Sequence, residues 1–171
     1  KDENANFALN KKELEKVTGK YQKLEVINSG SFIDLDEQTM NLIEQVCIDK
    51  QISELHFECH WMHRSSIPAL RTRFWKHKIN VKVKIGVETF DSNYRENILI
   101  AEYFDEICLL FGLEGQTAQS MKHDVETGLR YFERVCINIM VKNTTKILPC
   151  PSVIEIFRKE IYPLYQNDDR V

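Results

Sequence analysis

Five short apolar runs, separated by amphipathic segments, constrain the fold of this 171-residue chain more than any other feature. The runs are rich in Val, Ile, Leu and Phe, and several end at a glycine or a polar cluster, as strands often do. They occupy residues 23–30, 52–60, 79–88, 106–114 and 134–141. Strands that alternate with helices at this spacing predict parallel βαβ units with right-handed crossovers. The pattern predicts an α/β fold, either a doubly wound sheet or part of a (β/α) barrel.

Helical periodicity is clearest in two segments between the runs. In the first segment, Asp36 is the expected N-cap, and the apolar face consists of Met40, Ile43, Val46 and Cys47. In the second segment, Thr117 is the expected cap, and the apolar face consists of Ala118, Met121, Val125, Leu129 and Phe132. A further helix is expected to begin near Pro151, because proline is favoured in the first helical turn. The chain length predicts one domain over residues 1–171.

The connection between the third and fourth runs is short. Residues 89–105 must hold a loop, a helix and a return to the sheet, and a parallel crossover needs roughly a dozen residues or more. This tight spacing suggests that residues are absent from the sequence near positions 97–101.

Composition and charge limit the classes of function. Apolar residues make up 43% of the chain and charged residues 29%, as in an ordinary globular protein. The net charge of −3 gives no electrostatic sign of nucleic-acid binding, so direct binding to nucleic acid is not expected. No apolar run approaches the roughly 18 residues of a membrane span, and the polar start lacks the pattern of a signal peptide. We therefore expect a cytoplasmic protein without a membrane partner.

The five cysteines are odd in number and widely spaced: Cys47, Cys59, Cys108, Cys136 and Cys150. No two of them form a CxxC pair, so the pattern predicts neither a structural zinc site nor a disulfide framework. Most of them lie in or beside apolar runs, as buried free thiols do. This usage is typical of a reducing compartment.

Polar residues gather where the predicted strands end. Ligands of parallel α/β folds bind at the carboxyl ends of the strands, because loops and helix N-termini converge there. The first run ends in small polar residues that let a ligand approach the backbone: Asn28, Ser29, Gly30 and Ser31. Three later runs end in a glutamate, and we expect at least one of these carboxylates to contact a ligand: Glu58, Glu88 and Glu114.

The segment after the second run reads CHWMHR, residues 59–64. His60 and His63 are three residues apart, which on a helix is a weak zinc signal. The favoured interpretation is that both histidines bond to the backbone of a loop. In the alternative interpretation the segment is a pocket wall, with apolar side chains for a planar ring and basic ones for an anion or a proton: Trp61, Met62, His63 and Arg64.

Common catalytic and nucleotide-binding motifs are absent from the sequence. The chain contains no Walker A or G-x-G-x-x-G motif, so the cradling of a nucleotide phosphate is not supported. The turn that contains Ser29 and Ser31 is not the G-x-S-x-G elbow of serine hydrolases. No catalytic residue is assigned from the sequence.

Taken together, the strand ends resemble the radical S-adenosylmethionine (SAM) superfamily, in the branch that includes Elongator-type and methylthiotransferase-type enzymes. The matching segments follow the order of the family and cover most of the chain: NSGSF at 28–32, ELHFECHWMHR at 54–64, KIGVETFD at 84–91, FGLEGQT at 111–117 and INIMVKNTT at 137–145. The GSF and IGVET words form the most specific pair. Within the superfamily, the small size and the CHWMHR segment resemble the queuine lyase group, which acts in queuosine salvage.

The resemblance implies a partial (β/α)6 barrel of the TIM type with a parallel sheet. In this superfamily a CxxxCxxC loop after the first strand holds a 4Fe–4S cluster, which is reduced by an electron donor and cleaves SAM to a 5′-deoxyadenosyl radical. The chain departs from this pattern because it contains no CxxxCxxC. Its five runs would be the second to the sixth strands, the first strand would be absent, and the cluster ligands are expected upstream of Lys1.

The resemblance also implies site residues by strand order. Contacts to SAM are expected from Asn28, Ser29, Gly30, Ser31, Glu88 and Asn143. Queuine lyases remove the cyclopentenediol of queuine and leave 7-aminomethyl-7-deazaguanine, so the expected substrate is a small deazaguanine-like base. Contacts to this base through hydrogen bonds, stacking or charge are expected from Phe32, Glu58, His60, Trp61, His63, Arg64 and Glu114.

Three alternatives stay open at the level of sequence. The first is a radical SAM enzyme that acts on tRNA, which the net acidity and the lack of a basic stripe disfavour. The second is a cluster-free α/β binding module. The third is a barrel that binds a divalent metal through His60, His63 and a strand-end glutamate.

Overall fold

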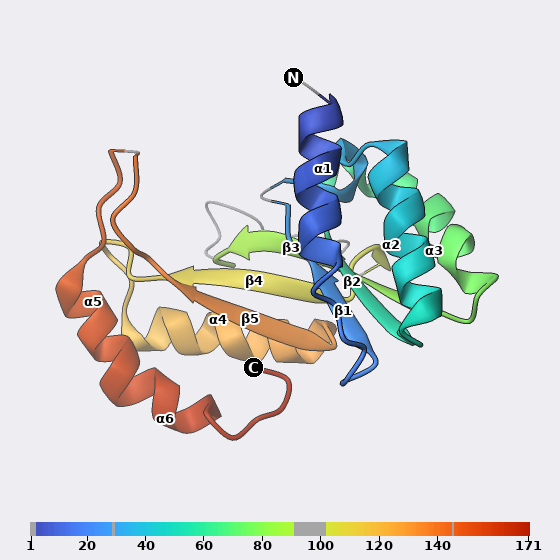
Figure 1. Ribbon diagram of the computed structural model, residues 1–171. Coiled ribbons are helices and arrows are strands. Elements are labelled where there is room, and N and C mark those ends of the chain that lie inside the picture. The colour runs from blue at the N-terminus through green and yellow to red at the C-terminus, as the bar shows by residue number, and fades with distance from the viewer. Residues whose placement is uncertain (1–2, 29, 91–101, 145) are drawn as a thin grey trace. The chain divides into compact units, whose positions relative to one another are not determined.

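The computed structural model describes residues 3–28, 30–90, 102–144 and 146–171. The chain divides into two compact units, Lys1–Lys84 and Ile85–Val171. Both units alternate strands with helices, as Figure 1 shows. That residues 1–171 make one domain stays a prediction.

The first unit begins with a helix and then alternates strands with helices. Its elements in chain order are α1 (Glu3–Leu14), β1 (Lys23–Val26), the 3₁₀ turn η1 (Phe32–Asp34), α2 (Glu37–Asp49), β2 (Glu54–Glu58), the 3₁₀ helix η2 (Trp61–Ser66) and α3 (Ile67–Trp75). Strand β3 (Asn80–Glu88) begins in this unit and ends in the second.

The second unit contains the end of β3 and two further strands. Its other elements are β4 (Glu106–Phe111), α4 (Ala118–Tyr131), β5 (Arg134–Ile139), α5 (Pro151–Ile156), the π-helical segment η4 (Phe157–Ile161) and α6 (Tyr162–Tyr165). Helix α4 packs on β4 and β5 and also contacts η4.

The strands are those that the sequence predicts. Each of the five apolar runs contains one strand, and the pairs β1–β2, β2–β3 and β4–β5 are parallel. The order of the strands in the sheet is that of the chain, with β3 next to β2 in the first unit and next to β4 in the second. The parallel α/β prediction is therefore confirmed.

Alternation along the strands separates an apolar face from a polar face in the first unit. Leu55 and Phe57 of β2 are buried, and the ring of Phe57 lies 6.0 Å from that of Phe74 on α3. Side chains alternate along a strand, so His56 and the residues aligned with the same face of β1, β2 and β3 point to the opposite side of the sheet. We call the titratable members of this set the polar face: Lys23, Glu25, Glu54, His56, Glu58, Lys82 and Lys84.

The two predicted amphipathic helices form with the predicted caps. The carboxylate of Asp36 accepts a hydrogen bond from Thr39 N at 2.7 Å at the start of α2, and Met40, Ile43 and Cys47 are buried on that helix. Thr117 caps α4 in a reciprocal arrangement with Ser120. The helix predicted at Pro151 is α5, which begins at that residue.

Helix α1 is not predicted by the sequence pattern, because its sequence is mostly polar and shows no apolar stripe. It packs against α2, and one link between them is a hydrogen bond from Asn10 Nδ2 to Thr39 Oγ1 at 3.1 Å. The segment after β2, whose geometry the sequence leaves open, is the 3₁₀ helix η2 leading directly into α3.

Two sequence predictions need correction or lie outside the structure. Glu114 does not end a strand: β4 ends at Phe111, where the chain turns at Gly112 with a φ of +103°. Residues 97–101, where the spacing suggests a gap, lie outside the described residues. Among the described residues, no helix has both the length and the apolar character needed to cross a membrane.

Candidate ligand-binding site

The turn after β1 is held by its own side chains. Asn28 Nδ2 donates a hydrogen bond to Ser31 O at 2.9 Å, and Ser31 N donates to Asp34 Oδ2 at 2.9 Å. A Cβ atom added at Gly30 would lie 2.7 Å from the same carboxylate oxygen. The turn therefore requires a glycine while Asp34 stays in place. Ser29 lies outside the described residues.

Ser31 connects this turn to the end of the neighbouring strand. Its side chain is buried, and Ser31 Oγ accepts a hydrogen bond from His60 N at 2.8 Å. Two predicted binding segments, the turn after β1 and the segment after β2, are thus brought together in the first unit. Loop convergence at strand ends explains this contact.

The segment CHWMHR forms a compact helical turn at this place. His60 is the N-cap of η2, and His60 Nδ1 accepts a hydrogen bond from Met62 N at 3.3 Å. The guanidinium of Arg64 lies 4.2 Å from the centre of the Trp61 ring and also donates to Trp61 O at 3.2 Å. The interpretation that His60 bonds to the backbone is therefore confirmed, and Arg64 is held against Trp61. His63 is half-buried on the same turn.

Phe32 lies in the core below the turn. Its ring is 7% exposed and lies 6.1 Å from the ring of Phe57. The structure therefore gives Phe32 a packing role, and stacking of this ring on a ligand stays a prediction.

Three charged side chains meet on the polar face, on three adjacent strands. Glu58, the last residue of β2, is aligned with Lys84 of β3. Lys84 is buried, and its ammonium makes an ion pair with Glu25 of β1. Burial raises the pKa of the Glu58 carboxyl; the charge of Lys84 opposes this rise and that of Glu25 adds to it.

Lys84 and Glu25 are not among the site residues that the sequence predicts. The signal for Lys84 lies in NVKVKIGVE, where Lys82, Lys84 and Gly86 alternate with apolar residues and so share one face of a strand. The sequence does not show that Lys84 reaches across β2 to Glu25, because this contact depends on the register of three strands.

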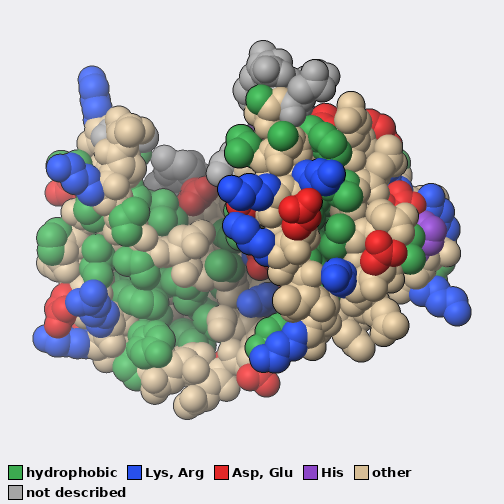
Figure 2. Space-filling view, in the orientation of Figure 1, with side chains coloured by type: hydrophobic (Ala, Val, Ile, Leu, Met, Phe, Trp, Pro, Cys, Tyr) green, Lys and Arg blue, Asp and Glu red, His purple; other side chains and the backbone are tan. Residues whose placement is uncertain are grey.

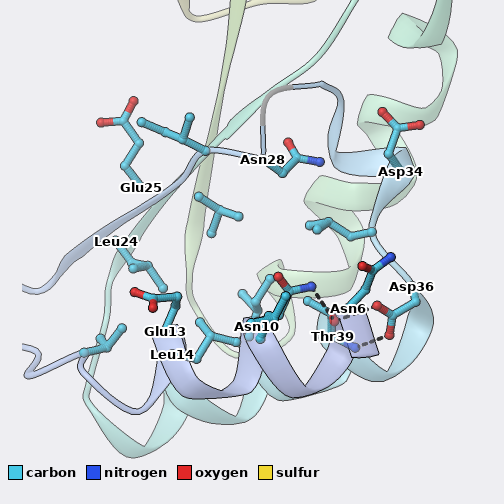
Figure 3. Close-up of a pocket in the computed structure, with 16 residues that line it drawn as sticks. Asn6, Asn10, Glu13, Leu14, Leu24, Glu25, Asn28, Asp34, Asp36 and Thr39 are labelled. Carbon is cyan, nitrogen blue, oxygen red and sulfur yellow. Dashed lines mark hydrogen bonds between the residues drawn. The ribbon is translucent and has the colours of Figure 1, made fainter. Parts of the chain in front are cut away.

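A cavity of about 700 Å³ borders the turn in the first unit. Figure 3 shows that α1 forms one wall, β1 another, and the turn and the start of α2 a third. The cavity shares Asn28 and Asp34 with the turn, and Glu25 with the polar face. A volume of this size is typical of small-molecule sites, which run from roughly 300 to 1,000 Å³.

In the second unit, Glu88 occupies an uncommon backbone conformation at the end of β3. Its φ of +67° is in the left-handed region, which costs a non-glycine residue about 1 kcal/mol. The next residues are fixed by the buried Asp124 of α4, which accepts hydrogen bonds from Thr89 Oγ1 at 2.7 Å and from Phe90 N at 2.8 Å. A strained residue on a rigid anchor is common at ligand sites.

The other two predicted contacts in the second unit are exposed. Glu114 lies in the loop after β4, where Gln116 rather than Glu114 fixes the backbone through bonds to Gly112 N and Leu113 N. Asn143 Nδ2 donates to Val141 O at 3.1 Å and to Ile147 O at 3.3 Å, which holds the loop after β5.

On the face shown in Figure 2, hydrophobic side chains gather over the second unit, and acidic and basic side chains are interspersed over the first.

The cysteines of this chain do not fit an iron–sulfur cluster. Such a cluster needs several thiolates at one place, whereas Cys47 lies on α2, Cys59 after β2, and the other three cysteines on β4, on β5 and before α5. In the described part of the chain, no three His, Cys, Asp or Glu side chains are grouped to hold a metal ion. The alternative of a divalent-metal site on His60 and His63 therefore has no third ligand there.

Comparison with known proteins identifies a similar solved structure. No protein-family model matches the chain, and the search of curated proteins gave no match. The chain is similar to queuine lyase from Clostridium spiroforme, solved with SAM and queuine bound, at 36% sequence identity and a TM-score of 0.88. The match covers 97% of this chain and 76% of that one, which confirms the partial barrel fold. The chain therefore belongs to the queuine lyase family within the radical SAM superfamily.

Proposed function

We propose that this chain is the SAM-binding and substrate-binding part of a radical SAM lyase that removes the cyclopentenediol from queuine, leaving 7-aminomethyl-7-deazaguanine. The observation that carries the proposal is the match in sequence and fold to a queuine lyase with SAM and queuine bound. The cavity beside the turn after β1 has a volume typical of small-molecule sites; of the proposed contacts among the described residues, Asn28 lines it.

In this proposal the turn from Asn28 to Ser31 receives the amino-acid part of SAM. The hydrogen bonds among Asn28, Ser31 and Asp34 hold its shape, so the turn binds without a large ordering cost. Glu88 and Asn143 stay proposed contacts to SAM from the resemblance alone.

The base is proposed to bind beside the segment after β2. Trp61 and Arg64, stacked on each other, form a rigid wall. Glu58, three residues before Trp61, is half-buried and is the proposed acceptor for the N–H groups of the base. His60, His63, Phe32 and Glu114 stay in the proposed set of contacts from the resemblance alone.

The 4Fe–4S cluster and its electron donor are proposed because enzymes of the radical SAM superfamily use them. Since the cysteines present do not fit the cluster, its ligands are proposed to lie upstream of Lys1, and the residues of this chain are proposed to bind and orient SAM and the base. A cytoplasmic location is likewise proposed from the composition and the cysteine usage.

Calorimetric titration of the chain tests the binding part of the proposal. Queuine and SAM should each bind saturably with a stoichiometry near one, and adenine should not compete with queuine. If tRNA bound and queuine did not, the alternative of a tRNA-modifying enzyme would take its place. If neither SAM nor queuine bound, a cluster-free module with another ligand would be favoured.

A further inference from the structure

The carboxylate of Glu58 is the open acceptor of the polar face. Glu58 and Lys84 are directly opposite each other on adjacent parallel strands, so their side chains leave the sheet on the same side. Yet the ammonium of Lys84 reaches back across β2 to Glu25 on β1. Within the described residues, the Glu58 side chain makes no hydrogen bond and no ion pair.

The ion pairs on this face leave one carboxylate, that of Glu58, without a partner among the described residues. Glu25 engages the positive charge of Lys84, and the side chain of Lys84 is only 7% exposed. Glu58 is partly withdrawn from water, and this burial raises the pKa of its carboxyl. A half-buried carboxylate of this kind gains most from a ligand that offers N–H donors.

We propose that Glu58 accepts the two adjacent N–H donors of the 2-aminopyrimidinone edge of a deazaguanine-type ligand, and that Lys84, held by Glu25, is a positioning residue that keeps Glu58 ionised. The inference rests on the proposed function and deepens it by naming the edge of the base that is recognised. Two parallel N–H donors match the two oxygens of one carboxylate, as in other bidentate pairs. A base without the 2-amino group offers only one of these donors.

Glu25 has a separate part in this arrangement. Without it, the ammonium of Lys84 would be drawn to Glu58, the nearest remaining carboxylate in register, and would occupy the acceptor that the ligand needs. The Glu25–Lys84 pair therefore keeps the cation close enough to stabilise the charge of Glu58 but engaged elsewhere.

Other titratable groups on this face are already engaged with one another. Glu54 pairs with Lys23 at 2.6 Å and with His56 at 3.0 Å, at the opposite end of β2 from Glu58. Lys82 lies in the row of Glu25 and His56. The charges that act directly on Glu58 are those of Lys84 and Glu25.

The test uses calorimetric binding of 7-deazaguanine and of 7-deazahypoxanthine, which lacks the 2-amino group. The wild-type chain should prefer 7-deazaguanine by ~10–100-fold, the value of a hydrogen bond to a charged acceptor. In Glu58→Gln this preference should fall to about onefold, because the amide presents a donor to a donor. The matched control is Glu155→Gln, which removes an exposed carboxylate of α5 that pairs with Lys159 of η4; this variant should keep the preference.

Four results in this titration would overturn the assignment. Equal binding of 7-deazaguanine by Glu58→Gln and the wild type would overturn the inference alone, as would loss of the preference in Glu114→Gln instead. Loss of SAM binding with retention of 7-deazaguanine binding in Glu58→Gln would show that the donor is the ammonium of SAM. No binding of 7-deazaguanine or queuine to the wild type would overturn the inference and the proposed function together.

The pH dependence of binding tests the roles of Lys84 and Glu25. The ligand needs ionised Glu58, so affinity is lost as the pH falls through the pKa of Glu58. Lys84→Gln removes a cation and should move the midpoint of this loss to higher pH; Glu25→Gln removes an anion, leaves Lys84 in place, and should move it to lower pH. A uniform fall in affinity with unmoved midpoints in both variants would assign the pair a merely structural role.

Discussion

At the scale of single residues, the turn after β1 depends on the absence of a side chain at Gly30. A Cβ atom there would meet Asp34 Oδ2 at 2.7 Å, so a larger residue must displace Asp34 and break its bond to Ser31 N. Because Asp34 is an exposed, movable side chain, the rest of the first unit can accommodate this change. The turn then loses the shape that the proposed SAM contact requires.

We expect Gly30→Val to weaken the binding of SAM by roughly tenfold or more, the cost of losing a charge-assisted contact, and to lower stability by less than about 1 kcal/mol. Calorimetric titration with SAM and thermal unfolding of the same sample provide the two numbers. Unchanged SAM affinity in a folded Gly30→Val variant would contradict a role for this turn in binding.

The left-handed conformation of Glu88 leads to a second prediction at this scale. Glu88→Gly should change the free energy of unfolding by less than about 0.5 kcal/mol, since glycine adopts a positive φ freely but loses more entropy on folding. Glu88→Val should lower it by about 1–2 kcal/mol, because a branched side chain at positive φ is strained. Both variants lose the carboxylate and should bind SAM less tightly. Equal stability of the two variants in denaturant titrations would contradict the strained conformation.

At the scale of elements, α2 and α3 are joined by ion pairs, and Glu44 makes more of them than any other carboxylate of α2. Glu44 of α2 bonds to His77 Nε2 at 2.7 Å, to Lys76 Nζ at 2.8 Å and to Arg73 Nε at 2.9 Å, all in or just after α3. Burial alone would raise the pKa of Glu44, but the hydrogen bonds from Lys76, His77 and Arg73 outweigh it and lower the pKa to about 2. The folded state therefore favours the ionised carboxylate.

Because folding lowers the pKa of Glu44, its carboxylate contributes fully to the free energy of unfolding above the unfolded pKa of about 4.5. This contribution is lost as the pH falls toward about 2. We expect Glu44→Gln to lower the free energy of unfolding at pH 7 by about 1–2 kcal/mol, less than the shift alone implies because Lys76 is largely exposed. Urea titrations at several pH values should show this difference shrinking below pH 4.5. A difference that stays constant down to pH 2.5 would contradict the assignment of the shift to Glu44.

Strands are predictable because alternation and β-branched residues act locally. The run at residues 79–88 contains β3, and both end at Glu88. Helix α1 is not predictable, because it is held by contacts to α2 rather than by an apolar stripe of its own. The site divides in the same way. The turn at Asn28 and the segment at His60 can be found in the sequence as polar segments that follow apolar runs. The ion pair between Glu25 and Lys84 cannot, because it depends on the register of three strands.

At the scale of the whole molecule, the fold and the family are shown and the reaction is proposed. A TM-score of 0.88 over nearly the whole chain means that the same elements occur in the same order as in queuine lyase. Function depends on the site and not on the fold alone, so the chemistry must be tested on the reaction itself.

Product analysis of the encoded protein tests the proposed reaction most directly. The protein, with iron and sulfide reconstituted under anaerobic conditions, is incubated with SAM, a reductant and queuine, and the products are measured by mass spectrometry. We predict that 5′-deoxyadenosine and 7-aminomethyl-7-deazaguanine appear together and that neither forms when SAM is omitted. Unchanged queuine in a sample that forms 5′-deoxyadenosine, or that modifies tRNA, would contradict the proposed reaction.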